Sequence, residues 1–174
     1  SLQNCYAAGD ERKALISYVS AGTNVCLMPK FMDTKSTTYN VIGNDQILLR
    51  YADVLLMYAE ALNEISHDAS AGSVALKHLN DVRMRSGVAG LSATELPDKE
   101  SFRKAVLDER QREFPYEGQR WFDLVRMGYA KEAMKVEGID IQDYQLLFPI
   151  PQTEMEKVGN TSILWQNPGY DSAN

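Results

Sequence analysis

The stretch that decides the fold, residues 108–128, reads D-E-R-Q-R-E-F-P-Y-E-G-Q-R-W-F-D-L-V-R-M-G. It divides at Pro115, because proline cannot continue the hydrogen-bond ladder of a helix and disfavours helical geometry in the residue before it. On the first piece, residues 101–114, Glu109 and Glu113 share a helical face with apolar side chains. A buried carboxylate is costly unless it is paired. The sequence therefore predicts cationic partners for both acids.

The second piece of the same stretch carries basic side chains that suit this role. Arg120 and Arg126 follow the proline. Because the two pieces meet at a corner, these arginines can face the two acids. The sequence predicts a structural ion-pair network that locks the corner, made of Glu109, Glu113, Arg120 and Arg126.

The same two acids allow a second interpretation, in which Glu109 and Glu113 are the paired carboxylates of a glycoside hydrolase. A general acid needs a raised pKa, whereas carboxylates surrounded by arginines have lowered pKa values. We therefore prefer the structural interpretation, and the sequence predicts no catalytic residue.

Composition bounds the class of protein. The 174 residues are enough for one domain with a core, and a net charge of −6 argues against a nucleic-acid partner. No apolar run reaches the roughly 18 residues that a membrane-spanning helix needs. The two cysteines, Cys5 and Cys26, form neither a disulfide framework nor a metal site, and can be bonded or free. No cofactor motif or metal-ligand spacing is present, so we expect neither group.

The first quarter of the chain is expected to be irregular. Residues 10–20 suit a short helix or strand, and residues 25–31 and 39–42 suit short strands. Asp45 is a plausible N-cap for a long helix that runs to about Ile65. That helix is apolar over most of its circumference, which predicts that it lies sandwiched between layers.

A second, amphipathic helix is expected over residues 73–86, with Gly87 just beyond its end. Together the two helices form an antiparallel hairpin whose length resembles one tetratricopeptide unit of roughly 34 residues.

Further helices are expected over residues 98–114 and 117–134, followed by a strand at 144–148 and a helical turn at 152–157. The apolar tail, residues 163–170, is expected to pack back onto the helices.

Six segments occur in an order that resembles one family. They are LRYADVLLMYAEA at 49–61, LNDVRMRSG at 79–87, DERQREF at 108–114, EGQRWFDLVR at 117–126, FPIP at 148–151 and QNPGY at 166–170. In this order they resemble the C-terminal half of the RagB/SusD family of outer-membrane nutrient-binding lipoproteins. The resemblance spans roughly residues 45–170.

The resemblance implies a mainly α fold of tetratricopeptide-like helical hairpins, with short irregular strands and long loops. Residues 46–174 would form the C-terminal helical domain, and residues 1–45 an irregular segment of the same domain. It implies non-catalytic binding of glycans or similar nutrients at the cell surface, and delivery to a SusC-like TonB-dependent outer-membrane transporter. The protein would be a surface-exposed lipoprotein whose lipid anchor and N-terminal half lie outside this chain.

No motif marks a sugar-binding residue, so none is carried over from the family. Two alternatives stay open. The chain can be a helical-repeat interaction scaffold without a ligand site, or the hydrolase that uses Glu109 and Glu113.

Overall fold

The computed structural model describes residues 2–20, 24–27, 29–31, 33, 35, 37, 43–45 and 47–170. The strand expected at 39–42 lies outside the described residues. The chain forms two compact units, residues 1–120 and residues 121–174. These units do not test the expected division of the chain into residues 1–45 and 46–174, which stays a prediction.

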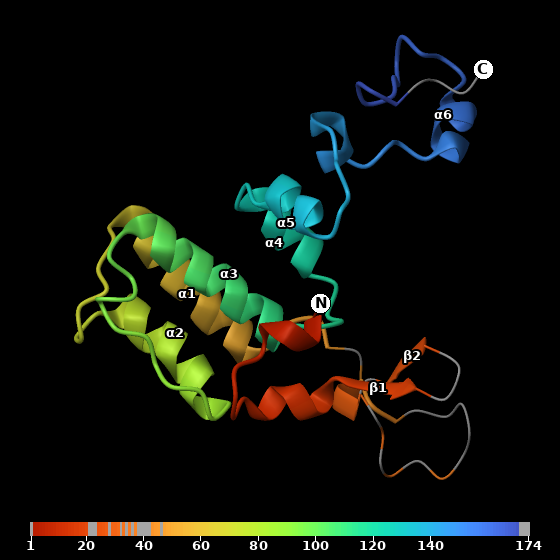
Figure 1. The fold of residues 1–174 in the computed structure, drawn as a ribbon. Helices are drawn as coiled ribbons and strands as arrows, with labels where there is room; N and C mark the ends of the chain where they lie inside the picture. The colour runs from red at the N-terminus through yellow and green to blue at the C-terminus, as the bar shows by residue number, and fades with distance from the viewer. Residues whose placement is uncertain are drawn as a thin grey trace. The chain divides into compact units, whose positions relative to one another are not determined.

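The described chain is mainly helical, as expected (Figure 1). Its α-helices are α1 (Tyr51–Ile65), α2 (Val74–Arg85), α3 (Lys99–Glu113), α4 (Arg120–Arg126), α5 (Ala130–Val136) and α6 (Gln152–Val158). Its 3₁₀ helices are η1 (Leu2–Cys5), η2 (Glu11–Leu15), η3 (Pro29–Phe31) and η4 (Asp143–Leu146). Strands β1 (Ser17–Ser20) and β2 (Asn24–Leu27) form an antiparallel pair with Ser17 opposite Leu27.

Helices α2 and α3 form close to the bounds that the sequence predicts, and each begins at a side-chain cap. Ser73 precedes α2, and its side chain accepts a hydrogen bond from the amide of Leu76. Asp98 and Ser101 form a reciprocal capping box at the start of α3. Side-chain oxygens at these positions satisfy amides that have no partner inside the helix. Gly87 adopts a φ of 78° just beyond α2, a conformation that glycine reaches without strain.

The start of α1 differs from the prediction. The helix begins at Tyr51, and Asp45 lies in irregular chain before it. Arg50 is extended, with a φ of −147° and a ψ of 164°. This conformation sends the Arg50 guanidinium to Glu113 and Glu117, so a tertiary contact replaces the expected first turns of helix.

Helices α1, α2 and α3 pack against one another and enclose the core of the first unit (Figure 1). The fully buried apolar side chains include Leu56 from α1, Leu79 from α2, and Phe102 and Val106 from α3. Only one face of α1 is buried here, so the sandwiched arrangement expected for this helix is not present within the described chain. Its opposite face is exposed.

The second unit departs from two predictions. The single helix expected over 117–134 is interrupted at Gly128, whose φ of 81° separates α4 from α5. The strand expected at 144–148 begins instead as the 3₁₀ helix η4. The tail packs partly on a helix, as expected, because the Tyr170 ring lies edge-on to the ring of Tyr144 in η4 with centroids 5.1 Å apart. Gln166 also donates to and accepts from the backbone of Ile150, which lies outside any helix.

The helical turn expected at 152–157 forms as α6. Among the described residues, we find no helix that is both long and apolar enough to cross a membrane.

Candidate functional site

Glu109 lies at the centre of a buried ion-pair network. Its side chain is fully buried on α3. One carboxylate oxygen accepts a bond of 2.6 Å from Arg12. The other accepts bonds of 3.1 Å from Arg83 and 2.8 Å from Arg112. Both oxygens are therefore engaged by guanidinium groups, which offsets the cost of burying the charge.

Arg12 joins the N-terminal segment to α3. Asp10 caps η2 by accepting a bond from the Arg12 amide, and its carboxylate also binds the Arg12 guanidinium at 2.9 and 2.8 Å. The same guanidinium reaches Glu109 at 2.6 Å and Glu113 at 2.9 Å. Burial opposes the charge on Arg12, but the hydrogen bonds that Arg12 donates to Asp10 and Glu109 outweigh it and raise the pKa of the guanidinium. Arg12 therefore bridges three carboxylates as a permanent cation.

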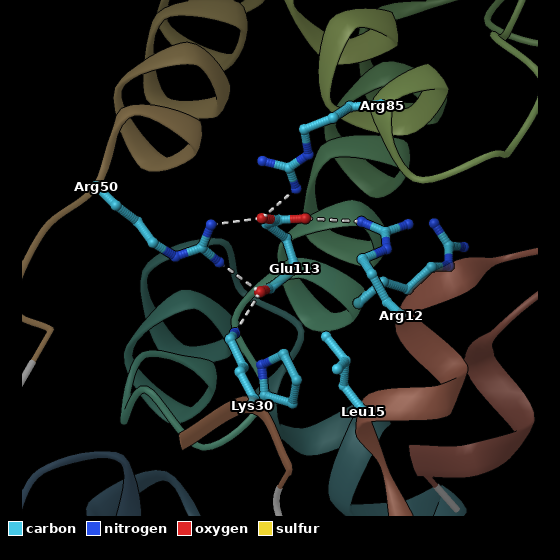
Figure 2. Close-up of a pocket in the computed structure, with 8 residues that line it drawn as sticks. Arg12, Leu15, Lys30, Arg50, Arg85 and Glu113 are labelled. Carbon is cyan, nitrogen blue, oxygen red and sulfur yellow. Dashed lines mark hydrogen bonds and ion pairs between the residues drawn. The ribbon is translucent and has the colours of Figure 1, made fainter. Parts of the chain in front are cut away.

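Glu113 occupies the end of α3, with its carboxylate between Arg12, Arg50 and Arg85 (Figure 2). The distances are 2.9 Å to Arg12, 2.5 Å to Arg50 and 2.6 Å to Arg85. Burial raises the pKa of Glu113, but hydrogen bonds from Arg85 and Arg50 outweigh it, so the pKa lies below its usual value. Glu113 is thus held as a carboxylate.

The backbone beyond Glu113 is held by the same kind of contact. The Glu113 carbonyl oxygen accepts bonds from Arg50 at 2.5 Å and from Lys30 at 2.8 Å (Figure 2). Lys30 and Arg50 also pair with Glu117. These carbonyl bonds satisfy a group that the end of a helix leaves without an intrahelical partner.

The corner at Pro115 is packed as well as paired. The Phe114 ring is buried, with the Arg50 guanidinium 4.6 Å and the Arg110 guanidinium 5.0 Å from its centroid. Arg110 in turn pairs with the buried carboxylate of Asp53 on α1 at 2.6 Å. Cations over an aromatic face are favourable when they are partly desolvated. The corner therefore ties α3 to α1 through charge and through an aromatic contact.

A small cavity of about 220 Å³ adjoins Glu113 (Figure 2). Its lining residues are Arg12, Leu15, Lys30, Arg50, Arg85, Arg112, Glu113 and Pro115. Burial lowers the pKa of Lys30, and the hydrogen bond that Lys30 donates to Glu117 only partly offsets this effect. A lining so rich in cations is unsuited to a metal ion, and the described residues contain no group of acids, histidines and cysteines that could hold one.

The structure brings together only part of the predicted network. Glu109 and Glu113 share Arg12 as a common partner. Arg120 donates to the carbonyl oxygen of Leu107 at 3.1 Å. Arg126, in the second unit, pairs with Asp123 at 2.8 Å. The structural role of the four residues as a corner lock stays a prediction.

The sequence did not indicate which arginines pair with Glu109 and Glu113. They are Arg12, Arg50, Arg83, Arg85 and Arg112. Only Arg112 lies near them in the sequence, with the i to i+3 spacing to Glu109 that places two side chains on one helical face. The other four come from η2, from α2 and from the residue before α1, and no local pattern links them to α3.

The comparisons with known proteins agree with this fold. The model of the SusD family matches residues 17–170. The chain belongs to the SusD family. SusD-like protein P2 of Formosa agariphila is 34% identical over 140 residues, which are 74% of this chain and 26% of that SusD-like protein.

Two solved structures extend the SusD-family comparison. A structure described as a laminarin-binding SusD-like protein has a TM-score of 0.66 and 28% identity, covering 97% of this chain and 37% of that one. NanU of B. fragilis has a TM-score of 0.69 and covers 98% of this chain and 38% of its own, but its 24% identity supports the fold alone. The chain therefore spans between a quarter and two fifths of the length of these three proteins.

Proposed function

We propose that this chain is part of a non-catalytic SusD-family protein that binds glycans at the cell surface. The observation that carries the proposal is the family match over residues 17–170. It is supported by the resemblance to a structure described as a laminarin-binding SusD-like protein. The proposed protein is an outer-membrane lipoprotein that passes its ligand to a SusC-like TonB-dependent transporter.

The chemistry of the buried acids supports a binding role rather than a hydrolytic one. A paired-carboxylate hydrolase needs one acid that is protonated near neutral pH. The pKa of Glu113 is lowered, and both oxygens of Glu109 accept bonds from arginines. Glu113 therefore does not supply the protonated acid that such a hydrolase needs, and guanidinium groups already occupy both oxygens of Glu109.

Calorimetric titration with laminarin oligosaccharides, followed by product analysis, tests the proposal. We expect saturable binding, with every oligosaccharide recovered at its original length. A panel of other neutral and acidic oligosaccharides serves as the specificity control. New, shorter products would contradict the proposal, above all if a folded Glu109→Gln variant no longer released them.

The main alternative is a helical-repeat scaffold without a ligand site in this chain. The chain spans only 26% and 37% of two of its relatives. This favours the alternative, because ligand-binding residues can lie in the rest of a longer protein. A pull-down with the SusC-like transporter separates the two. Retention of the transporter without binding of any oligosaccharide would favour the scaffold over the glycan-binding proposal.

A further inference from the structure

The ion-pair network around Glu109 and Glu113 contains more cations than carboxylates. Its cations are Arg12, Lys30, Arg50, Arg83, Arg85 and Arg112. The carboxylates that pair with them are those of Asp10, Glu109, Glu113 and Glu117. Six positive side chains and four negative ones leave two positive charges in excess among the described residues. This excess is local, because the whole chain has a net charge of −6.

Three cations of this network have hydrogen-bond donors to spare, and all three line the cavity beside Glu113. Arg85 donates to the Glu113 carboxylate through Nη2, which leaves its Nε and Nη1 without an acceptor within the described chain. Arg112 donates through Nε and Nη1 and keeps Nη2. Lys30 uses two of the three N–H groups of its ammonium. The lining of this cavity therefore offers more donors than the described chain uses.

The same three cations differ in their exposure to solvent. The Arg85 side chain is 55% exposed, whereas those of Lys30 and Arg112 are 14% and 19% exposed. A solute can therefore reach the cavity at Arg85 and meet the other two cations in more buried surroundings. The exclusion of water there strengthens the attraction between opposite charges.

The volume of the cavity, about 220 Å³, sets the size of the solute. Sites for drug-sized ligands occupy roughly 300–1,000 Å³, whereas one water molecule takes up about 30 Å³ in the liquid. The cavity therefore has room for one small charged group and not for an oligosaccharide.

Glu113 also lines the cavity, but the charge of its carboxylate is already balanced. One oxygen accepts bonds from Arg50 and Arg85, and the other accepts a bond from Arg12 (Figure 2). Lys30 is balanced less well, since burial lowers the pKa of its ammonium below the ordinary value. An anion in the cavity would supply the negative charge that Lys30 lacks.

We propose that this cavity binds one anionic group of sulfate, phosphate or carboxylate chemistry, with Arg85, Arg112 and Lys30 as its donors. The forked guanidinium group matches the paired oxygens of all three anions, and such charge-assisted hydrogen bonds are strong. The group can be a free inorganic ion or an acidic substituent on a sugar, since only its charged oxygens enter the cavity. The proposal rests on the lining of the cavity and not on the proposed function.

Calorimetric titration of the 174-residue chain with sodium sulfate tests the proposal. The titration is run at low ionic strength, with sodium chloride at matched ionic strength as the reference for non-specific effects. Arg85→Gln removes the most exposed of the three donors. Arg83→Gln is the matched control, because Arg83 lies on the same helix and also pairs with a buried glutamate but is not part of the cavity lining. Circular dichroism checks that each variant is folded.

We expect saturable binding of sulfate to the wild type, and an affinity at least about tenfold lower in Arg85→Gln because charge-assisted hydrogen bonds are lost. Arg83→Gln should bind sulfate like the wild type. No saturable binding to the wild type would overturn the proposal. Equal affinities of the wild type and a folded Arg85→Gln would also overturn it.

Protection from chemical modification tests the same cavity without any variant. Phenylglyoxal modifies exposed arginines, and mass spectrometry measures the rate at each one. Sulfate should slow the modification of Arg85 over the concentration range in which it binds by calorimetry. Arg126, whose side chain is 41% exposed and lies in the second unit, is the internal control and should react at an unchanged rate. Equal protection of both arginines, or of neither, would overturn the proposal.

Two sugar derivatives distinguish the sources of the anion. Glucose 6-sulfate and glucuronate carry the two kinds of acidic group, and glucose is the neutral control. Displacement of sulfate by either derivative would show that the cavity accepts an acidic substituent, and displacement by neither would show that it takes the free ion; both results support the proposal. Displacement by glucose would overturn it, because binding would then not depend on charge. The titration with laminarin oligosaccharides is independent of this result, so the two proposals fail separately.

Discussion

The ion pairs around Glu109 and those on the surface of α2 have nearly the same geometry but different surroundings. Arg12 and Glu109 are 2.6 Å apart, and Lys77 and Asp81 are 2.7 Å apart. The Glu109 side chain is fully buried, whereas the Lys77 side chain is 67% exposed. Water competes for the exposed pair and screens it, while the buried carboxylate has no solvent to return to if its partners are removed.

This difference shows that the distance between two charges does not by itself determine how much the ion pair contributes to the stability of the fold. The exposed pair joins two residues of one helix turn, and α2 would form without it. The buried pairs join η2, α2 and the segment before α1 to one end of α3. Their loss would therefore affect the tertiary structure, whereas loss of the exposed pair would leave it intact.

Glu109→Gln should have the largest effect. Removing the charge leaves Arg12, Arg83 and Arg112 without the carboxylate that they share. We expect the free energy of unfolding to fall by roughly 3–5 kcal/mol, the usual cost of breaking a buried pair. Urea denaturation followed by circular dichroism measures it. Glu154→Gln, which breaks an exposed pair with Lys157, is the matched control. Equal decreases in the free energy of unfolding in the two variants would refute the distinction between buried and exposed ion pairs.

Glu113→Gln should have an intermediate, pH-dependent effect. The pKa of Glu113 is lower in the folded chain than its ordinary value of 4.5, so its contribution is present above that value and is lost as pH falls through the folded pKa. We expect a loss of roughly 1.5–3 kcal/mol at neutral pH, the range for charge-assisted hydrogen bonds.

Urea denaturation of the wild type and Glu113→Gln across pH 3–7 measures this contribution. The difference between the two proteins should shrink as pH falls below 4.5. A constant difference across the whole range would show that the carboxylate charge does not stabilise the fold.

Asp81→Asn should have the smallest effect. Its side chain pairs with Lys77 on the exposed surface of α2, and such i to i+4 pairs contribute about 0.3–0.5 kcal/mol. The loss should disappear at high salt, because salt screens exposed charges. Thermal melts at low and high ionic strength measure both points. A loss of stability comparable with that of Glu109→Gln would contradict the conclusion that the exposed pair contributes much less than the buried pairs.

The sequence predicted best where the signals are local. The predicted starts of α2 and α3, near Ser73 and Asp98, agree with the structure, where both residues cap their helices, because helical periodicity and caps act over a few residues. The two buried acids were also predictable, since their spacing places them among apolar residues on one helical face. The partner arginines were not, because Arg12 lies 97 residues from Glu109 along the chain.

The start of α1 and its exposed face show the same limit. Periodicity extends the helix back to Asp45, but the reach of Arg50 to Glu113 holds the preceding chain extended. Periodicity also shows that α1 is apolar nearly all round, without showing which face the rest of the described chain covers. Packing energy depends on neighbours that are distant in sequence, so it overrides local preference at both places.

The sequence by itself therefore determined the helical class, the hairpin of α1 and α2, the approximate bounds of α2 and α3, and the burial of Glu109 and Glu113. Tertiary structure alone decided which cations neutralise those acids, where α1 begins, and which of its two faces is buried. The physical reason is range. Caps and helical periodicity act over a few residues, whereas charge pairing and burial depend on which distant segments the folded chain brings together.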